Sequence, residues 1–111
     1  IEGNVVKIPS DFKNDTKYRK IPHIGWNSIM PDTSQWNSKI FNNIEINDFF
    51  YFIHSYMCKL KYKKYRIAYS NYNECEITSG VQVGNIIGLQ FHPEKSGVSG
   101  LRVLKNFIEY F

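Results

Sequence analysis

The feature that most constrains the fold is a strand that stops abruptly at a proline, close to the carboxy-terminal end of the chain. Ile86 to Phe91 is a short apolar run, which predicts a strand, and Pro93 has no N–H with which to continue a sheet. Gly84-Asn85 precedes this run and suits the positive φ angles of a tight hairpin turn. The sequence therefore predicts two strands between Cys75 and Phe91, and the second one delivers Phe91-His92-Pro93-Glu94 at its end.

A helix is predicted soon after this strand. Ser99 follows Gly97 and is a residue type that caps the amino-terminal ends of helices. Apolar residues then recur at spacings of three and four, with Phe107 beside them, at Leu101, Leu104, Ile108 and Phe111. This is the periodicity of one apolar helix face.

Further strands are predicted upstream. Pro22 keeps Ile21 out of the helical region, and Trp26 favours an extended segment from Ile21 to Ile29. Phe49 to Tyr56 is rich in aromatic residues, which predicts a buried strand, and Tyr65 to Tyr69 alternates well enough for another.

Two connecting segments have weaker patterns. The polar residues from Ser10 to Lys20 predict a loop. Asp32-Thr33-Ser34 offers helix caps before a short helical turn, which would place Trp36, Ile40 and Phe41 on one side.

The composition is that of one folded domain, so we expect residues 1–111 to form a single structural unit. Of the 111 residues, 42% are hydrophobic and 22% are charged, close to the averages of soluble globular proteins. We recognise no apolar run of the ~20 residues that a membrane span needs and no signal peptide, so a cytoplasmic location is expected. Cys58 and Cys75 show no CxxC pairing, so neither a disulfide framework nor a zinc site is suggested, and we expect no metal or cofactor.

A basic run from Lys59 to Arg66 is interleaved with Tyr62 and Tyr65, and the formal net charge is +4. Such a pattern can bind nucleic acid. Lysines on loops and strand edges are more often solvated, and they discourage edge-to-edge aggregation. We therefore expect neither nucleic acid nor a membrane as a partner.

His92 and Glu94 have the spacing of a catalytic pair. Side chains two residues apart at a strand end point to the same side, and Pro93 between them stiffens the backbone. A carboxylate that binds one imidazole nitrogen leaves the other free to take a proton from a nucleophile. With a thiol, the pair would stabilise a thiolate able to attack an amide carbonyl. Taken alone, a His-x-Glu at a strand end is more commonly a surface ion pair than a catalytic pair.

The run from Asn85 to Ser96 resembles the carboxy-terminal motif of class I glutamine amidotransferases. Two upstream segments, in the same order, are similar to glutaminase subunits of imidazole glycerol phosphate synthases: Pro22-His23-Ile24-Gly25-Trp26-Asn27 and Tyr51-Phe52-Ile53-His54-Ser55-Tyr56. Gly100 to Phe107 fits the terminal helix of these subunits. The resemblance runs from Gly3 to Phe107 and covers only the carboxy-terminal half of the family's domain.

The resemblance implies an α/β fold of the flavodoxin-like, three-layer type with a mostly parallel central sheet, of which this chain would be the strand-rich carboxy-terminal portion. It also implies a Cys-His-Glu triad, in which His92 is the general base and acid and Glu94 orients it. The family's nucleophile is a cysteine on a sharp strand-to-helix turn flanked by glycines, and neither Cys58 nor Cys75 has that setting. We expect the chain to be inactive on its own.

Substrate and partner are also implied by the resemblance. Glutamine would be hydrolysed to glutamate and ammonia, and the ammonia would pass to a (β/α)8-barrel cyclase subunit in histidine biosynthesis. Ser55 and Tyr56 match a segment near the head group of glutamine. Trp26, Tyr51 and Lys95 match positions at or near the subunit interface, although ordinary core packing is the alternative for the two aromatic residues.

Two further histidines and two other functions are alternatives to these assignments. His23 and His54 are interpreted as hydrogen-bonded structure rather than as additional bases. A paralogous amidotransferase that supplies ammonia for surface-polysaccharide sugar modification would carry the same motifs. A chain without its nucleophile is also compatible with an inactive, partner-binding fragment.

Overall fold

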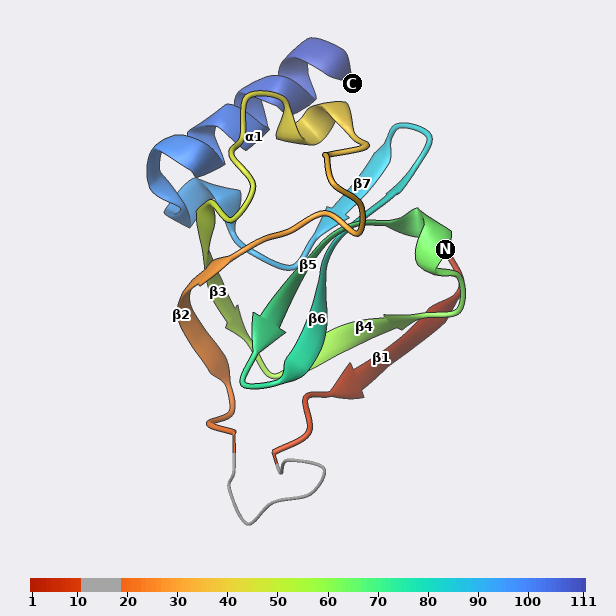
Figure 1. Cartoon of the computed structure of the whole chain (residues 1–111), viewed down its shortest axis with the longest axis vertical. Helices are drawn as coiled ribbons and strands as arrows, with labels where there is room; N and C mark the ends of the chain where they lie inside the picture. The colour runs from red at the N-terminus through yellow and green to blue at the C-terminus, as the bar shows by residue number, and fades with distance from the viewer. Residues whose placement is uncertain (11–18) are drawn as a thin grey trace.

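The computed structural model describes residues 1–10 and 19–111, so most of the loop predicted between Ser10 and Lys20 lies outside the described residues. The described part is rich in strands and ends in a helix that lies at one end of the molecule (Figure 1). Its strands are β1 (Gly3–Lys7), β2 (His23–Ser28), β3 (Phe49–His54), β4 (Tyr56–Leu60), β5 (Arg66–Tyr72), β6 (Cys75–Val83) and β7 (Ile86–Leu89). Its helical elements are the short 3-10 turns η1 (Lys39–Phe41), η2 (Lys63–Tyr65) and η3 (Pro93–Lys95) and the α-helix α1 (Gly97–Tyr110).

Every pairing between the described strands is antiparallel. β1 pairs with β4, with Gly3 opposite Leu60, and β2 pairs with β3, with Trp26 opposite Tyr51. β5, β6 and β7 form a meander of neighbours in sequence. The strand-rich character implied by the resemblance is confirmed, whereas the mostly parallel sheet is not found among the described strands.

The main hydrophobic core lies between the β2–β3 pair, the meander and α1. Phe50 and Phe52 of β3 are fully buried in it, and their rings pack against Phe91 at the start of the His92 segment. Ile29, Ile40, Phe41 and Val103 complete its centre. Because Phe91 is packed in the core, it fixes the point at which His92 reaches the surface.

Most of the strand predictions are confirmed. β2 lies within the predicted segment, β5 extends the predicted Tyr65–Tyr69 strand to Tyr72, and β6 and β7 flank Gly84-Asn85. Gly84 has a φ of 58°, while Asn85 is not among the residues with positive φ. This is the φ pattern of a type II′ turn, which needs glycine only at its first central position.

Two strand assignments differ from the prediction. The segment Phe49–Tyr56 is not one strand, because it breaks at Ser55 and Tyr56 begins β4. β3 is also buried on one side only. Phe50 and Phe52 point into the core, whereas Phe49 and Ile53 are exposed on the other side. β1 and β4 were not predicted, because the paired residues lie 49 to 57 positions apart in the sequence, from Lys7 with Tyr56 to Gly3 with Leu60, and no local pattern reveals such a pairing.

The predicted helical turn is present, but its cap is a different residue. Ser38 accepts the N–H of Ile40 at 3.3 Å and caps η1, whereas Asp32 instead binds Arg66. Ile40 and Phe41 are buried, and the Trp36 ring packs on Phe41 with 4.5 Å between ring centroids. The prediction that these side chains share one side is confirmed.

Helix α1 begins earlier than predicted and turns a different face inward. It starts at Gly97, and Ser99 does not cap it, because the Ser99 hydroxyl donates to Asp48 Oδ2 at 2.7 Å. The buried residues are Gly100, Val103 and Asn106, and Asn106 Nδ2 donates to the carbonyls of Ile40 and Asn42. The small residue Gly100 and the two hydrogen bonds of Asn106 therefore set the rotation of the helix, and its apolar periodicity does not.

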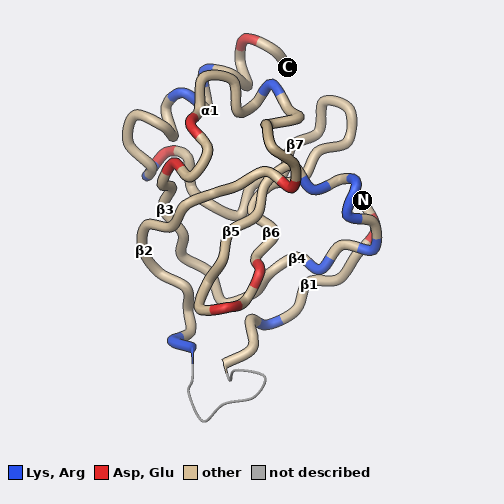
Figure 2. The backbone as a smooth tube through the Cα atoms, in the orientation of Figure 1, with Lys and Arg blue, Asp and Glu red and all other residues tan. Residues whose placement is uncertain are grey.

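The basic run contains charges that are already paired. Arg66 is buried and donates to both Asp32 and Glu76. The hydrogen bond from Arg66 is the main cause that lowers the pKa of the Asp32 carboxyl. Lys63 lies 3.9 Å from the same two carboxylates, and Lys61 lies 3.2 Å from Glu2. Figure 2 shows basic residues gathered on the side of β4 near the amino terminus. That nucleic acid is not a partner stays a prediction.

No helix in the described ranges is long and apolar enough to cross a membrane.

Candidate active site

His92 lies where the meander ends and η3 begins. Its backbone is extended, with φ −99° and ψ 99°, and Pro93 follows at the first position of the turn. The backbone N–H of His92 donates to the carbonyl of Tyr51 at 3.0 Å. β3 therefore holds the backbone at His92, whereas β7 itself ends at Leu89 and not at the predicted Phe91.

The side chains of His92 and Glu94 meet. His92 Nδ1 lies 3.1 Å from Glu94 Oε1, and the two side chains are 42% and 55% exposed. Because the carboxylate is an acceptor, Nδ1 carries the proton and Nε2 is left as a base. No hydrogen bond engages Nε2 within the described residues. The contact is as predicted, and its catalytic role remains a prediction.

Ser96 holds this segment against β3 and was not singled out by the sequence. Its hydroxyl donates to the carbonyl of His92 at 2.7 Å and accepts the N–H of Tyr51 at 2.9 Å. The side chain is buried, so both bonds are shielded from water. Tyr51 thus contacts the His92 turn through both of its backbone polar groups. The only sequence signal for Ser96 is its place at the end of the Asn85–Ser96 run.

Gly100 lets α1 approach η3 closely. A Cβ atom added at Gly100 would lie 1.9 Å from the carbonyl oxygen of Pro93 and 2.8 Å from the Cβ of Ser96. Only a residue without a side chain fits there, since the nearest atom belongs to the backbone. The start of α1 therefore supports the turn that carries His92 and Glu94.

His23 and His54 form a separate hydrogen-bonded chain. His54 Nδ1 lies 2.8 Å from the carbonyl of Tyr56, so that nitrogen must donate. His54 Nε2 is then an acceptor for His23 Nδ1 at 2.9 Å, and His23 Nε2 accepts from Asn27 Nδ2 at 3.3 Å. Both rings are neutral in this arrangement, and neither has a free basic nitrogen.

The electrostatics agree with this assignment. Burial is the main cause that lowers the pKa of His23 to about 4, and the repulsion that a protonated His54 would exert is the second cause. Burial also lowers the pKa of His54, with the charge of His92 acting in the same direction and the Tyr56 carbonyl opposing it. The interpretation of both residues as hydrogen-bonded structure fits these contacts.

Ser55 and Tyr56 lie at the corner between β3 and β4. The Ser55 carbonyl accepts the N–H of Ile8 at 2.9 Å, and the Tyr56 carbonyl accepts from His54. The Tyr56 side chain is exposed. Neither side chain has a hydrogen bond to His92 or Glu94 within the described part, so their assignment as substrate contacts is a proposal.

The three candidate interface residues are exposed or half-exposed. Trp26 and Tyr51 are opposite each other in the β2–β3 register, and their rings meet edge to face with 6.0 Å between centroids. Trp26 is 56% exposed, which excludes core packing as its role. Lys95 is exposed on η3. Ile24, Phe49 and Ile53 are also exposed and lie on the same outer side of the β2–β3 pair, a feature that the sequence did not reveal.

Neither cysteine has a hydrogen bond to His92 among the described residues. Cys58 lies in β4 opposite Val5, and Cys75 lies in β6 with its Sγ 3.9 Å from the sulfur of Met57. Both thiols are free, and burial raises the pKa of Cys75, the reverse of what an activated thiolate requires. Within the described ranges, no group of three or more His, Cys, Asp and Glu side chains gathers in a metal-binding arrangement.

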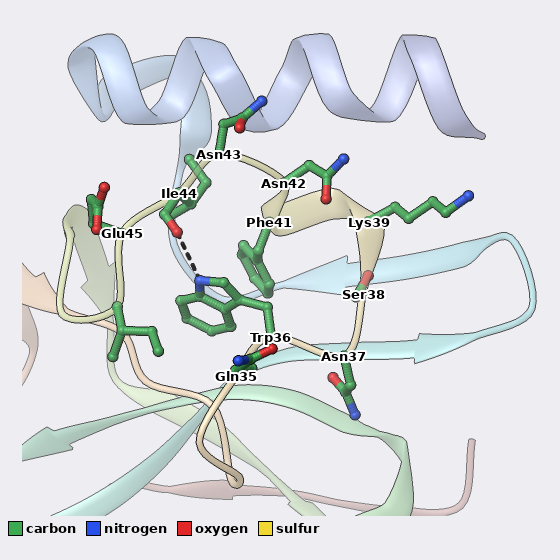
Figure 3. A pocket seen from close by; sticks show the side chains of 11 residues that line it. Gln35, Trp36, Asn37, Ser38, Lys39, Phe41, Asn42, Asn43, Ile44 and Glu45 are labelled. Carbon is green, nitrogen blue, oxygen red and sulfur yellow. Dashed lines mark hydrogen bonds between the residues drawn. The ribbon is translucent and has the colours of Figure 1, made fainter.

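A hollow of about 690 Å³ lies elsewhere, in the loop from Gln35 to Ile46 beneath α1 (Figure 3). Trp36 lines it, and its Nε1 donates to the carbonyl of Ile44 at 2.9 Å, as the dashed line shows. Its lining includes neither His92 nor Glu94. We therefore do not connect it with the candidate site.

Comparison with known proteins identifies the family of this chain. The chain belongs to the class I glutamine amidotransferases, because the family profile described as "Glutamine amidotransferase class-I" matches residues 3–110.

Three similar proteins carry the name of one subunit of imidazole glycerol phosphate synthase. It is 39% identical to "Imidazole glycerol phosphate synthase subunit HisH 1" of Legionella pneumophila (strain Lens), covering 98% of this chain and 52% of that protein. It is 47% identical to the HisH subunit of Buchnera aphidicola subsp. Acyrthosiphon pisum (strain APS), covering 95% and 50%, and 44% identical to that of Salmonella typhimurium, covering 80% and 42%. The chain spans about half the length of these relatives.

Proposed function

We propose that this chain is the carboxy-terminal part of the glutaminase subunit of imidazole glycerol phosphate synthase, a cytoplasmic enzyme of histidine biosynthesis. The observation that carries the proposal is the 3.1 Å contact between His92 Nδ1 and Glu94 Oε1 at the end of the meander, with Nε2 unengaged. The names and identities of the relatives support the same assignment.

His92 and Glu94 supply two parts of the proposed triad. A cysteine outside these 111 residues would attack the side-chain carbonyl carbon of glutamine, and its proton would pass to Nε2 of His92. As the C–N bond breaks, His92 returns that proton to the leaving nitrogen and ammonia departs, leaving a glutamyl thioester. His92 then takes a proton from water, which attacks the thioester, and glutamate and the thiol are released. Glu94 keeps the ring in one tautomer and orientation throughout.

The exposed aromatic side of the β2–β3 pair supports the proposed partner. Trp26 and Phe49 are 56% and 57% exposed, and Ile24 is 52% exposed. Exposed aromatic and aliphatic side chains gathered on one face mark protein–protein contacts. We propose that this face, with Lys95 beside it on η3, binds the (β/α)8-barrel cyclase subunit that receives the ammonia. Ser55 and Tyr56 would lie near bound glutamine.

The proposal is tested by restoring the missing half. The segment of the Buchnera aphidicola relative that precedes the matched region would be fused to this chain, and glutamate release would be measured with the cyclase subunit present. We expect activity, and we expect His92→Ala to lower kcat by about 10² to 10⁴-fold because the proton-transfer group is lost. Lys59→Ala, at an exposed position on β4 opposite Asn4, is the control and keeps the activity.

Two results would contradict the proposal. If His92→Ala were as active as the control, His92 would not be the base. If only a barrel partner from sugar modification stimulated the fusion, the assignment to histidine biosynthesis would be wrong.

A further inference from the structure

The corner between β3 and β4 is the place where the chain changes its sheet partner. β3 pairs with β2 and ends at His54, whereas β4 pairs with β1 and begins at Tyr56, so Ser55 is the residue that joins the two strands. Ser55 and Tyr56 are also the residues that are proposed above to lie near bound glutamine. How firmly this corner is held therefore bears on how well the substrate is bound.

Hydrogen bonds from two sides hold the corner. The N–H of Ile8 donates to the Ser55 carbonyl at 2.9 Å, and His54 Nδ1 donates to the Tyr56 carbonyl at 2.8 Å. Because the bond from His54 spans Ser55, it restricts the backbone on both sides of that residue. The side chain of His54 thus fixes the bend between the two strands.

His54 is in turn held by His23. Its Nε2 accepts from His23 Nδ1 at 2.9 Å, and His23 is only 3% exposed. The ring of His23 stacks on Phe52 and on Tyr72, with 4.9 and 4.1 Å between ring centroids. A buried and stacked ring keeps one orientation, so it holds the His54 ring where its Nδ1 reaches the Tyr56 carbonyl.

The strand that leads into the corner also holds the proposed base. The carbonyl of Tyr51 in β3 accepts the N–H of His92, and β3 continues from there to His54. The charge of His92 is one of the causes that lower the pKa of His54, so the two imidazoles lie within electrostatic range of each other. A substrate that is held at the corner can therefore be presented to His92.

We propose that His54 is a positioning residue for glutamine, and that its bond to the Tyr56 carbonyl holds Ser55 and Tyr56 in the arrangement that binds this substrate. His54 itself exchanges no proton, because both of its ring nitrogens are engaged. The inference rests on the proposed function, which places glutamine near Ser55 and Tyr56. Loss of a positioning bond of this kind weakens substrate binding, so it raises KM for glutamine more than it lowers kcat.

Two substitutions separate the two hydrogen bonds of His54. An asparagine side chain places an amide nitrogen near the position of Nδ1, and a glutamine side chain places an amide oxygen near the position of Nε2. His54→Asn therefore keeps the bond to Tyr56 and loses the contact with His23, whereas His54→Gln does the reverse.

Both variants would be measured in the fusion of this chain with the amino-terminal segment of the Buchnera aphidicola relative, with the cyclase subunit present. We expect His54→Gln to raise KM for glutamine by about 5- to 10-fold, the effect of one lost hydrogen bond, with kcat within about twofold of the wild type. His54→Asn should stay within about twofold of the wild type in both constants.

The matched control removes a bond of the same kind from another loop. Thr33 Oγ1 donates to the carbonyl of Gln35, which is also two residues further on and also at 2.8 Å. Thr33→Val removes this bond and keeps the shape of the side chain, and we expect the KM and kcat of the wild type. Thermal melting shows whether each variant is folded. A general loss of structure would impair both His54 variants, whereas the positioning role impairs only His54→Gln.

The outcomes separate this inference from the proposed function. An active fusion in which His54→Gln leaves KM unchanged, or in which His54→Asn raises it as much, would overturn the inference while the proposed function stands. An inactive fusion would contradict the proposed function, and calorimetry of glutamine binding would then decide on His54. Weaker binding by His54→Gln than by His54→Asn would support the positioning role, and equal affinities, or no binding by the unsubstituted fusion, would overturn it.

A measurement without substitution decides if His54→Gln unfolds. The 15N resonance of His54 Nδ1 in the unsubstituted fusion should shift when glutamine is added, because the corner that this nitrogen holds receives the substrate. An unchanged resonance at saturating glutamine would overturn the inference.

Discussion

The three histidines illustrate how neighbours decide the chemistry of one residue type. His92 is partly exposed, has a carboxylate on Nδ1 and keeps Nε2 available. His54 and His23 use both ring nitrogens in bonds that run from the Tyr56 carbonyl to Asn27. One histidine is therefore arranged to exchange a proton, and the other two are arranged to remain neutral.

The neutral pair should make stability depend on pH. The pKa of His23 is about 4 in the folded chain and 6.5 in an unfolded one, so the unfolded state binds more protons between these values. This contribution to the free energy of unfolding is complete above pH 6.5 and is lost as the pH falls toward 4. We expect a loss of about 2 kcal/mol at pH 4.5.

Urea unfolding at pH 7 and pH 4.5 would measure this loss in the wild type and in His23→Gln, which cannot titrate. The variant should lose less free energy of unfolding than the wild type. An equal loss in both proteins would mean that His23 is not the responsible group.

At the scale of secondary-structure elements, the junction between η3 and α1 determines where the candidate site lies. Ser96 ties the His92 turn to β3, and Gly100 allows α1 to lie against Pro93. Asn106 fixes the rotation of the same helix by donating to two carbonyls of the η1 region. The turn is thus held from two sides by elements that themselves belong to the core.

Gly100→Ala should destabilise the protein, although alanine is the better helix former. In an exposed helix this substitution would stabilise by about 1 kcal/mol. Here the new methyl group would lie 1.9 Å from a backbone oxygen, so the helix must move away from η3. We expect a net loss of about 1–3 kcal/mol in the free energy of unfolding, measured by denaturant titration. Arg102→Ala, on the exposed side of α1, is the control and should change stability by less than ~0.5 kcal/mol. A stabilised Gly100→Ala chain would show that the close approach is not required.

Features that depend on residues close together in the sequence were predicted, and features that join distant segments were missed. The turn at Gly84 and the contact of His92 with Glu94 are set by neighbouring residues, and they were predicted, although β7 ends at Leu89 and not at the predicted Phe91. The β1–β4 pairing and the bond from Tyr51 to Ser96 join segments forty-five or more residues apart, and no local pattern indicates them. The inner face of α1 was missed for another reason, because a glycine and an asparagine define it and neither is apolar.

At the scale of the whole molecule, the chain has a packed core around Phe50, Phe52 and Phe91 and two uncovered apolar surfaces. One is the outer side of the β2–β3 pair, and the other is formed on α1 by Val98, Leu101 and Ile108. A chain that exposes two such surfaces is expected to associate readily with other proteins or with itself.

The chain by itself should hydrolyse no glutamine. Cys58 lies in β4 opposite Val5, and Cys75 is buried with a raised pKa, so neither supplies a thiolate to His92. Glutamate release from the purified 111-residue chain should equal that of a blank without protein. Activity that disappears in Cys58→Ala would place the nucleophile within this chain and contradict that expectation.

The way Tyr51 is attached has a consequence for how such a protein can evolve. Its N–H donates to the Ser96 hydroxyl and its carbonyl accepts from the His92 N–H, so Tyr51 holds the segment of the proposed base through its own main-chain atoms only. Its ring faces Trp26 on the outer side. Main-chain bonds persist whichever side chain is present. The side chain at position 51 can therefore be substituted, for example to suit a different binding partner, while His92 keeps its place.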